Sequence, residues 1–172
     1  MRPGRVLRGL LKILGGYKAY EKLLLSEIDK SRLPTHIAII LDGNRRWARK
    51  RGMPPWYGHL KGAEKAEEVL YWCLELGIKT VTLYVLSTEN LRRSPEELER
   101  LFEILRTYLK RALSDERIDR YRVKVKAIGK LELLPDDIRE LIRELERKTE
   151  GYDSHYPVSY THLRAHETEA DL

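Results

Sequence analysis

The chain has few of the features that define several common protein classes. It contains a single cysteine, Cys73, among 172 residues, so a disulfide framework and a cysteine-based metal site are excluded. No segment reaches the roughly 18 uninterrupted apolar residues that a membrane-spanning helix needs. The sequence therefore resembles neither a disulfide-stabilised secreted scaffold nor a helical membrane protein, and we predict a cytoplasmic location.

Charged residues, in contrast, are abundant. The composition is 42% hydrophobic and 35% charged, which is typical of a globular domain rather than of a disordered chain. The formal net charge of +6 favours polyanionic partners such as nucleic acid, phosphorylated small molecules or anionic lipid. Charge alone does not distinguish among these partners.

Hydrophobic periodicity predicts an alternation of strands and helices. Strands are expected over 36–42, 80–86 and 122–129, and helices over 17–29, 59–76, 94–109 and 134–151. This alternation is typical of an α/β domain with a parallel central sheet, in which ligands bind beyond the carboxyl ends of the strands. The first strand is a continuous apolar run, which predicts that both of its faces are covered.

The same patterns divide the chain into three regions. Residues 1–32 are expected to form N-terminal helices. The first of these is basic and amphipathic, and two interpretations stay open: it lies on an anionic membrane surface, or it packs on the domain. Residues 33–156 carry the α/β pattern, whereas 157–172 show no helical or strand periodicity. We therefore expect these last residues not to belong to the domain.

The first strand ends on an acid that is followed by cations. Asp42, Gly43 and Asn44 precede Arg45 and Arg46 at the start of a helix. A glycine allows a ligand to approach the backbone closely, the first N–H groups of a helix attract anions, and arginine binds phosphate oxygens. A carboxylate beside a phosphate is compatible with this use if Mg²⁺ lies between them. The alternative is that Asp42 caps the helix and the cations are simply solvated.

The second strand is also followed by polar residues. Ser87, Thr88, Glu89, Asn90 and Arg93 lie in the loop that leads to the next helix. Hydroxyl groups and arginine can bind a phosphorylated ligand, and the amide of Asn90 can orient a reacting group. The alternative is an ordinary loop before a helix that Ser94 caps, with Glu97 completing a capping box.

Three further side chains have both a functional and a structural interpretation. His59, just before a helix, either contacts a phosphate or is a structural histidine. Trp47 and Trp56 either line an apolar channel or belong to the core. The segment RRWARKR, residues 45–51, also resembles a basic patch that binds single-stranded nucleic acid, but no established nucleic-acid motif accompanies it.

Three separated motifs show a resemblance to a known family. The stretches HIAIILDGNRRWARKRG, GHLKGAEK and GIKTVTLYVLSTENLRRSPEEL closely resemble the cis-prenyltransferases of the undecaprenyl diphosphate synthase type, and the archaeal branch in particular. The resemblance runs from about Leu33 to Tyr156. It implies an α/β fold with a parallel sheet, Mg²⁺, an apolar tunnel and usually a homodimer. It also implies a transferase that condenses isopentenyl diphosphate with an allylic diphosphate, farnesyl or geranylgeranyl, into a long cis-polyprenyl diphosphate.

The resemblance implies roles for individual residues. By position, Asp42 is similar to the Mg²⁺-linked catalytic aspartate and Asn90 to the asparagine assigned to proton removal. An amide is a poor base, so we expect Asn90 to position the substrate. The residues that the resemblance places at the substrate are Gly43, Asn44, Arg45, Arg46, Trp47, His59, Ser87, Thr88, Glu89, Leu91 and Arg93.

The sequence also departs from the family. An aromatic residue is replaced by Leu91, and an arginine of many bacterial members by Pro55, both near the allylic substrate. The segment from Pro157 to Leu172 resembles translated sequencing-adapter read-through, so we expect a truncated chain with a non-native tail. It would lack the isopentenyl diphosphate site and be inactive as written. The alternatives are a non-catalytic partner subunit and, less favoured, a nucleic-acid-binding domain; we expect no nucleic acid as partner.

Overall fold

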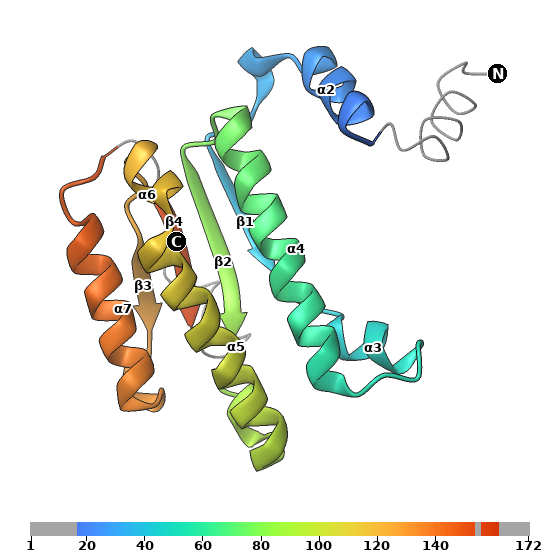
Figure 1. Ribbon diagram of the computed structural model, residues 1–172, viewed down its shortest axis with the longest axis vertical. Helices are drawn as coiled ribbons and strands as arrows, with labels where there is room; N and C mark the ends of the chain where they lie inside the picture. The colour runs from blue at the N-terminus through green and yellow to red at the C-terminus, as the bar shows by residue number, and fades with distance from the viewer. Residues whose placement is uncertain (1–16, 154–155, 162–172) are drawn as a thin grey trace, which may run out of the picture. The chain divides into compact units, whose positions relative to one another are not determined.

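The computed structural model describes residues 17–153 and 156–161 (Figure 1). The chain divides into two compact units, 1–33 and 34–172. In the first unit, helix α2 spans Tyr17–Glu27 and a 3-10 turn spans Lys30–Arg32. The basic amphipathic helix expected before residue 17 lies outside the described residues. No described helix combines the length and the apolar character needed to cross a membrane.

The second unit is built on a parallel sheet. Its strands are β1 (His36–Ile40), β2 (Thr80–Leu86), β3 (Lys126–Gly129) and β4 (Tyr156–Thr161), in the order β1-β2-β4-β3. All three pairings are parallel. The predicted α/β class with a parallel sheet is confirmed, and β2 has the bounds that periodicity predicts.

The last strand is a difference from the expectation. No strand was predicted beyond Pro157, yet β4 lies between β2 and β3 and pairs with both. A proline has no N–H to give to a ladder and is rare in central strands, so local sequence argued against this assignment. Parallel pairing depends on backbone groups, and the other residues of β4 each supply both an N–H and a C=O. The expectation that residues 157–172 are non-native stays a prediction.

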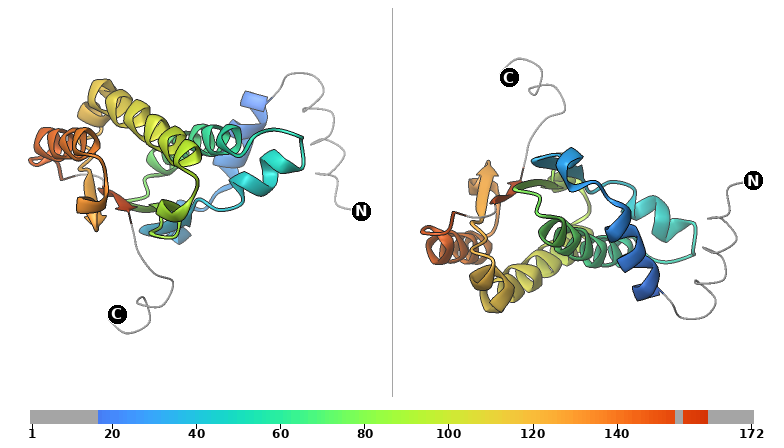
Figure 2. Two further views of the ribbon diagram at one scale, coloured as in Figure 1. Left: turned by 90° about the horizontal axis from the view of Figure 1, so that it is seen from below. Right: turned by 90° about the horizontal axis from the view of Figure 1, so that it is seen from above.

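Helices cover one face of this sheet. They are α3 (Asn44–Arg49), α4 (Pro55–Leu76), α5 (Pro95–Ser114), α6 (Glu116–Arg120) and α7 (Asp136–Thr149). Figure 2 shows α4, α5 and α7 along the same side of the strands. The prediction that β1 is covered on both faces is wrong, because its exposure alternates and Ile40 is 73% exposed. In the described part of the chain, β1 is an edge strand with one open face.

Short-range signals explain where the helices begin and end. Ser94 caps α5 through its side chain, which accepts a hydrogen bond from Glu97 N, with Pro95 at the first helical position. Gly77 ends α4 in the left-handed conformation (φ 77°) that glycine tolerates best. Apolar side chains of α5 and α7 pack together in the core. Its buried members are Leu86, Phe102, Leu134, Ile138 and Ile142.

Candidate functional site

The topology brings the two polar loops to one edge of the sheet. Strands β1 and β2 are parallel neighbours with Ile40 opposite Tyr84. Their carboxyl ends therefore open in the same direction, and Leu41 N still donates to Tyr84 O (3.3 Å). The loop after β1 and the loop after β2 thus face each other, as the sequence predicts for a site at a strand edge.

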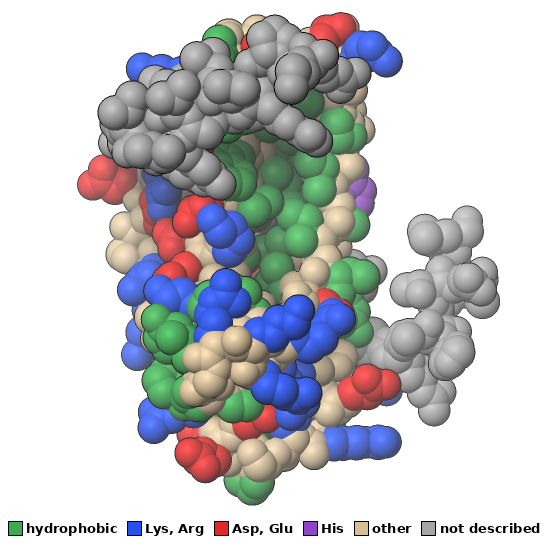
Figure 3. All heavy atoms as spheres, turned by 90° about the vertical axis from the view of Figure 1, so that its right-hand side faces the viewer, with side chains coloured by type: hydrophobic (Ala, Val, Ile, Leu, Met, Phe, Trp, Pro, Cys, Tyr) green, Lys and Arg blue, Asp and Glu red, His purple; other side chains and the backbone are tan. Residues whose placement is uncertain are grey.

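A single cavity of about 580 Å³ connects these loops to the interior. Figure 3 shows Lys and Arg side chains gathered beside a hydrophobic hollow on this face. The apolar wall comes largely from α4, β2 and α5. The polar lining includes Asp42, Asn44, Arg45, Arg46, His59, Asn90 and Arg93. The cavity therefore joins a charged mouth to a long apolar interior.

The loop after β1 is held by its glycine and by an ion pair. Gly43 has φ 87° and is the N-cap of α3, without a side-chain cap, so the alternative in which Asp42 caps the helix is wrong. The Asp42 carboxylate accepts hydrogen bonds from Gly43 N and, at 3.0 Å, from Arg46 Nη2. The Asp42 side chain is 76% exposed. It is therefore accessible to a ligand.

Two glycines of α4 bring this loop against the helix. A Cβ at Gly58 would lie 2.1 Å from Asn44 O, and a Cβ at Gly62 would lie 2.5 Å from Asn44 Oδ1. Asn44 thus occupies space that only glycine leaves free on this helix face. The spacing of four residues between the glycines of GHLKG is the sequence signal for this close approach.

The loop after β2 forms a 3-10 turn over Asn90–Arg92. Asn90 donates to Ser87 Oγ from its backbone N (3.3 Å) and also from its side-chain Nδ2. Ser87 therefore fixes the Asn90 amide at the cavity wall. Leu91 instead packs against the hydrophobic core cluster.

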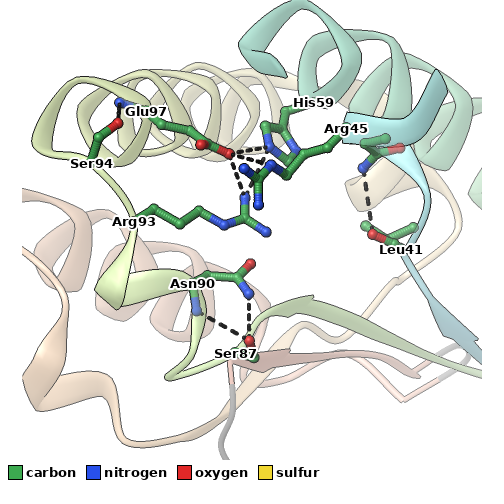
Figure 4. A network of polar contacts seen from close by, with 9 residues as sticks. Leu41, Arg45, His59, Ser87, Asn90, Arg93, Ser94 and Glu97 are labelled. Carbon is green, nitrogen blue, oxygen red and sulfur yellow. Dashed lines mark hydrogen bonds and ion pairs between the residues drawn. The ribbon is translucent and has the colours of Figure 1, made fainter. Parts of the chain in front are cut away.

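Behind the mouth, one carboxylate joins three side chains that we call the cationic cluster: Arg45, His59 and Arg93 (Figure 4). Glu97 Oε1 lies 3.3 Å from Arg45 Nε, 3.2 Å from His59 Nε2 and 3.0 Å from Arg93 Nη1. The sequence predicts only a capping-box role for Glu97. In the structure, the Glu97 carboxylate faces the cationic cluster. The capping-box interpretation of the SPEE motif gives no indication of this contact.

Two members of the cluster, His59 and Arg93, have shifted pKa values. Burial lowers the pKa of His59 below its ordinary value, and the hydrogen bond that the ring can donate to Glu97 partly opposes that shift. Burial also lowers the pKa of the Arg93 guanidinium, although Glu97 opposes the change. His59 is thus neither an ordinary surface histidine nor an isolated core residue. It belongs to the polar wall of the cavity.

Not all residues expected at the substrate line this cavity. Trp47 stacks on Tyr57 with ring centroids 6.3 Å apart, and Arg51 lies over its indole ring. Trp56 is 38% exposed and does not line this cavity, so the expected channel wall is not formed by its side chain. The residues of the expected set that are absent from the cavity lining are Trp47, Ser87, Thr88, Glu89 and Leu91.

The Asp42 carboxylate is accessible at the mouth of the cavity. Within residues 17–153 and 156–161, no group of three or more His, Cys, Asp or Glu side chains is arranged to hold a metal ion. Mg²⁺ is commonly bound by one or two carboxylates, with water and substrate phosphates as its other ligands. The exposed Asp42 carboxylate at a basic mouth fits that mode of binding.

The fold and the cavity define a class: an α/β protein whose parallel sheet presents, at its carboxyl edge, a cavity with a charged mouth and an apolar interior. The family described as "Putative undecaprenyl diphosphate synthase" matches residues 40–163, and the chain belongs to this family of prenyltransferases. The match continues past Tyr156, where the resemblance was expected to stop, and includes the range of β4.

Individual relatives agree with this assignment. The chain is 49% identical over 139 residues to a tritrans,polycis-undecaprenyl-diphosphate synthase (geranylgeranyl-diphosphate specific) from Pyrococcus abyssi, covering 81% of this chain and 53% of the relative. It is 50% identical over 140 residues to the protein of the same name from Archaeoglobus fulgidus, covering 81% and 56%. The chain spans about half the length of these curated relatives.

A solved structure supports the fold in the same way. The crystal structure of lavandulyl diphosphate synthase from Lavandula x intermedia in complex with dimethylallyl diphosphate matches with a TM-score of 0.69 and 29% identity. The match covers 74% of this chain and 54% of that one. The described sheet and helices therefore correspond to about half of a longer prenyltransferase fold.

Proposed function

We propose that this chain carries the allylic half of the active site of a cis-prenyltransferase, which extends an allylic diphosphate with isopentenyl diphosphate. One observation carries the proposal: a single cavity joins Asp42, Arg45 and Arg46 to an apolar interior. A prenyl diphosphate has the same two parts, an anionic head and a hydrocarbon tail. The names of the archaeal relatives support geranylgeranyl diphosphate as the starter.

The proposed reaction makes clear demands on the residues. The allylic C–O bond breaks and diphosphate leaves with the electron pair; the double bond of isopentenyl diphosphate forms the new C–C bond, and a proton is lost. Arg45, Arg46 and Arg93 stabilise the charge that develops on the leaving diphosphate. Asn90, held by Ser87, orients the reacting end of the substrate. The apolar wall keeps water away from the allylic cation.

Asp42 is the residue that would hold Mg²⁺. Its carboxylate is exposed at the mouth, and it has Arg46 as a neighbour that also attracts a phosphate. When bound, the ion would neutralise charge on the departing diphosphate. The pairing of Asp42 with Arg46 keeps the loop ordered before a ligand arrives.

The alternative of a non-catalytic partner subunit is less favoured. Such a subunit needs neither a charged mouth nor an apolar cavity, and the chain keeps both, with Asp42 and Asn90 in the lining. For the 172-residue chain itself, we propose that turnover requires residues that its longer relatives possess, including those that bind isopentenyl diphosphate.

The test is to complete the chain. The C-terminal half of the Archaeoglobus fulgidus relative is fused after residue 153, and incorporation of labelled isopentenyl diphosphate is measured with geranylgeranyl diphosphate as starter. We expect polyprenyl products from the fusion, and none from the 172-residue chain. Asp42→Ala in the fusion should lower turnover by at least about a hundredfold. Equal activity in the fusion with and without the Asp42 carboxylate would contradict the assigned role.

A further inference from the structure

Glu97 is an anion inside a site that is built to bind an anion. Its side chain is 12% exposed, and the side chains of His59 and Arg93 are 10% and 18% exposed. Charged groups at this depth are costly unless they are paired. Glu97 therefore neutralises part of the cationic cluster when no substrate is present.

The contacts converge on one atom. Arg45 Nε, His59 Nε2 and Arg93 Nη1 all lie within 3.3 Å of Glu97 Oε1. Arg93 donates a hydrogen bond to this oxygen and Arg45 forms an ion pair with it. Guanidinium groups gathered at a single negatively charged oxygen are also the arrangement by which proteins bind a phosphate oxygen. Figure 4 shows the side chains of this group pointing toward one another from α3, α4, α5 and the loop that precedes α5. The carboxylate oxygen thus occupies a position suited to an oxygen of the ligand.

The cluster is also reachable by a ligand. Glu97, Arg45, Asn90 and Arg93 line a second, mainly polar cavity of about 520 Å³. Arg45, Asn90 and Arg93 also line the larger cavity. A diphosphate at the mouth can therefore contact the same guanidinium groups that now contact Glu97.

We propose that Glu97 is a positioning residue that substitutes for a diphosphate oxygen in the empty site. It orders Arg45, His59 and Arg93 before the substrate binds, and it competes with the diphosphate for the two arginines. This competition lowers the affinity for diphosphate and so favours its release after the reaction. The inference deepens the proposed function, because it concerns the binding of diphosphate at the same site.

The state of His59 provides an independent readout. His59 Nε2 lies 2.9 Å from Arg93 Nη1 and 3.2 Å from Glu97 Oε1. A neutral ring with an unprotonated Nε2 accepts from Arg93, whereas a protonated ring donates to Glu97. Glu97 raises the pKa of His59 against the effect of burial. Removal of the negative charge should therefore lower the pKa of His59 further.

The experiment compares Glu97→Gln with Glu103→Gln in the full 172-residue chain. Inorganic pyrophosphate is titrated into each protein by calorimetry. Glu97→Gln should bind pyrophosphate about tenfold more tightly, which is near the lower end of the usual range of coupling. We expect a value near the lower end because Arg45 is 47% exposed and its interaction with Glu97 is partly screened by water. Glu103 lies on the same helix and pairs with Arg100, both about half exposed. Its variant makes the same change in net charge and should leave the affinity within about twofold.

A second variant and a check of folding distinguish an effect of the carboxylate from a loss of structure. Glu97→Asp keeps the charge but withdraws it by one methylene group, and it should give a smaller increase in affinity than Glu97→Gln. Circular dichroism verifies that each variant is folded. NMR titration of the histidines should show a lower pKa for His59 in Glu97→Gln and no change in Glu103→Gln.

Several results would overturn the inference. Unchanged or weaker pyrophosphate binding by Glu97→Gln would show that the carboxylate does not compete with the ligand, and so would an unchanged pKa of His59. Absence of pyrophosphate binding in the unmodified chain would do the same. Failure of the proposed function is distinguishable, because it appears as a completed fusion that incorporates no isopentenyl diphosphate although pyrophosphate binding responds to Glu97→Gln.

Discussion

Replacement of Gly58 by alanine tests whether the site depends on the contact between α3 and α4. The new Cβ would lie 2.1 Å from Asn44 O, 2.8 Å from Asn44 C and 3.0 Å from Ala48 Cβ. Two of these are backbone atoms, which no change of rotamer can move away, and Ala48 is fully buried. The helix that carries Arg45 and Arg46 must therefore shift as a unit.

The expected size of the effect follows from two opposing contributions. Overpacking of this kind destabilises by roughly 1–3 kcal/mol or more, whereas alanine is favoured over glycine within a helix by about 1 kcal/mol. Because the clash is severe, we expect a net loss of about 2 kcal/mol, or a fall in Tm of roughly 4–8 °C for a chain of this length. Pyrophosphate binding should weaken at the same time, since the arginines of α3 move with it.

The assay is thermal unfolding followed by circular dichroism, with two companion variants. At Gly62 the atoms in the way belong to the Asn44 side chain, which can rotate, so Gly62→Ala should cost less stability. Gly151→Ala meets nothing within 4 Å and serves as the control. An unchanged or higher Tm for Gly58→Ala would refute the reasoning, because it would mean that helix propensity outweighs the predicted clash.

Three further predictions concern other parts of the molecule. Ile138→Ala removes a core side chain with 0% exposure and should lower the free energy of unfolding by about 2–5 kcal/mol, as measured by urea denaturation. Burial raises the pKa of the Cys73 thiol, so at pH 8 it should react with a thiol reagent much more slowly in the folded chain than in urea; equal rates would contradict its burial. In the completed fusion, Ser87→Ala frees the Asn90 amide and should lower kcat by about tenfold with little change in KM, whereas a change in KM alone would indicate that Ser87 acts on substrate binding.

The sequence predicted the parts of the fold that local patterns control. The alternation of strands and helices, the bounds of β2 and the caps at Gly77 and Ser94 depend on residues close together in the chain. The strand at Tyr156–Thr161 was not predicted, because its position depends on partners about 30 and 75 residues away. The open face of β1 also depends on which distant elements pack against it. An apolar run is compatible with an edge strand and with a central strand, so this exposure could not be predicted from the sequence.

The site was predictable to a similar extent. Asp42, Arg45 and Arg46 follow a strand directly, so their place at the sheet edge follows from chain direction alone. The contacts of Glu97 at the site could not be predicted in this way. Its place in the first turn of a helix is already explained by the capping box with Ser94. Its contacts with His59 and Arg45 join three separate helices, and nothing in their spacing along the chain indicates which carboxylate meets which cation.

The strand order affects how the sheet forms while the chain is being synthesised on the ribosome. Strand β3 is made before β4, yet β4 lies between it and β2. Until β4 emerges, β3 has no neighbouring strand with which to pair, and α5 and α7 are joined by side-chain packing and by the ion pair of Arg106 with Asp137. Strands β1 and β2 can pair earlier, since the helix between them is already complete. The sheet is therefore completed at a late stage, and a nascent chain that pauses before β4 leaves β3 and the facing edge of β2 unpaired.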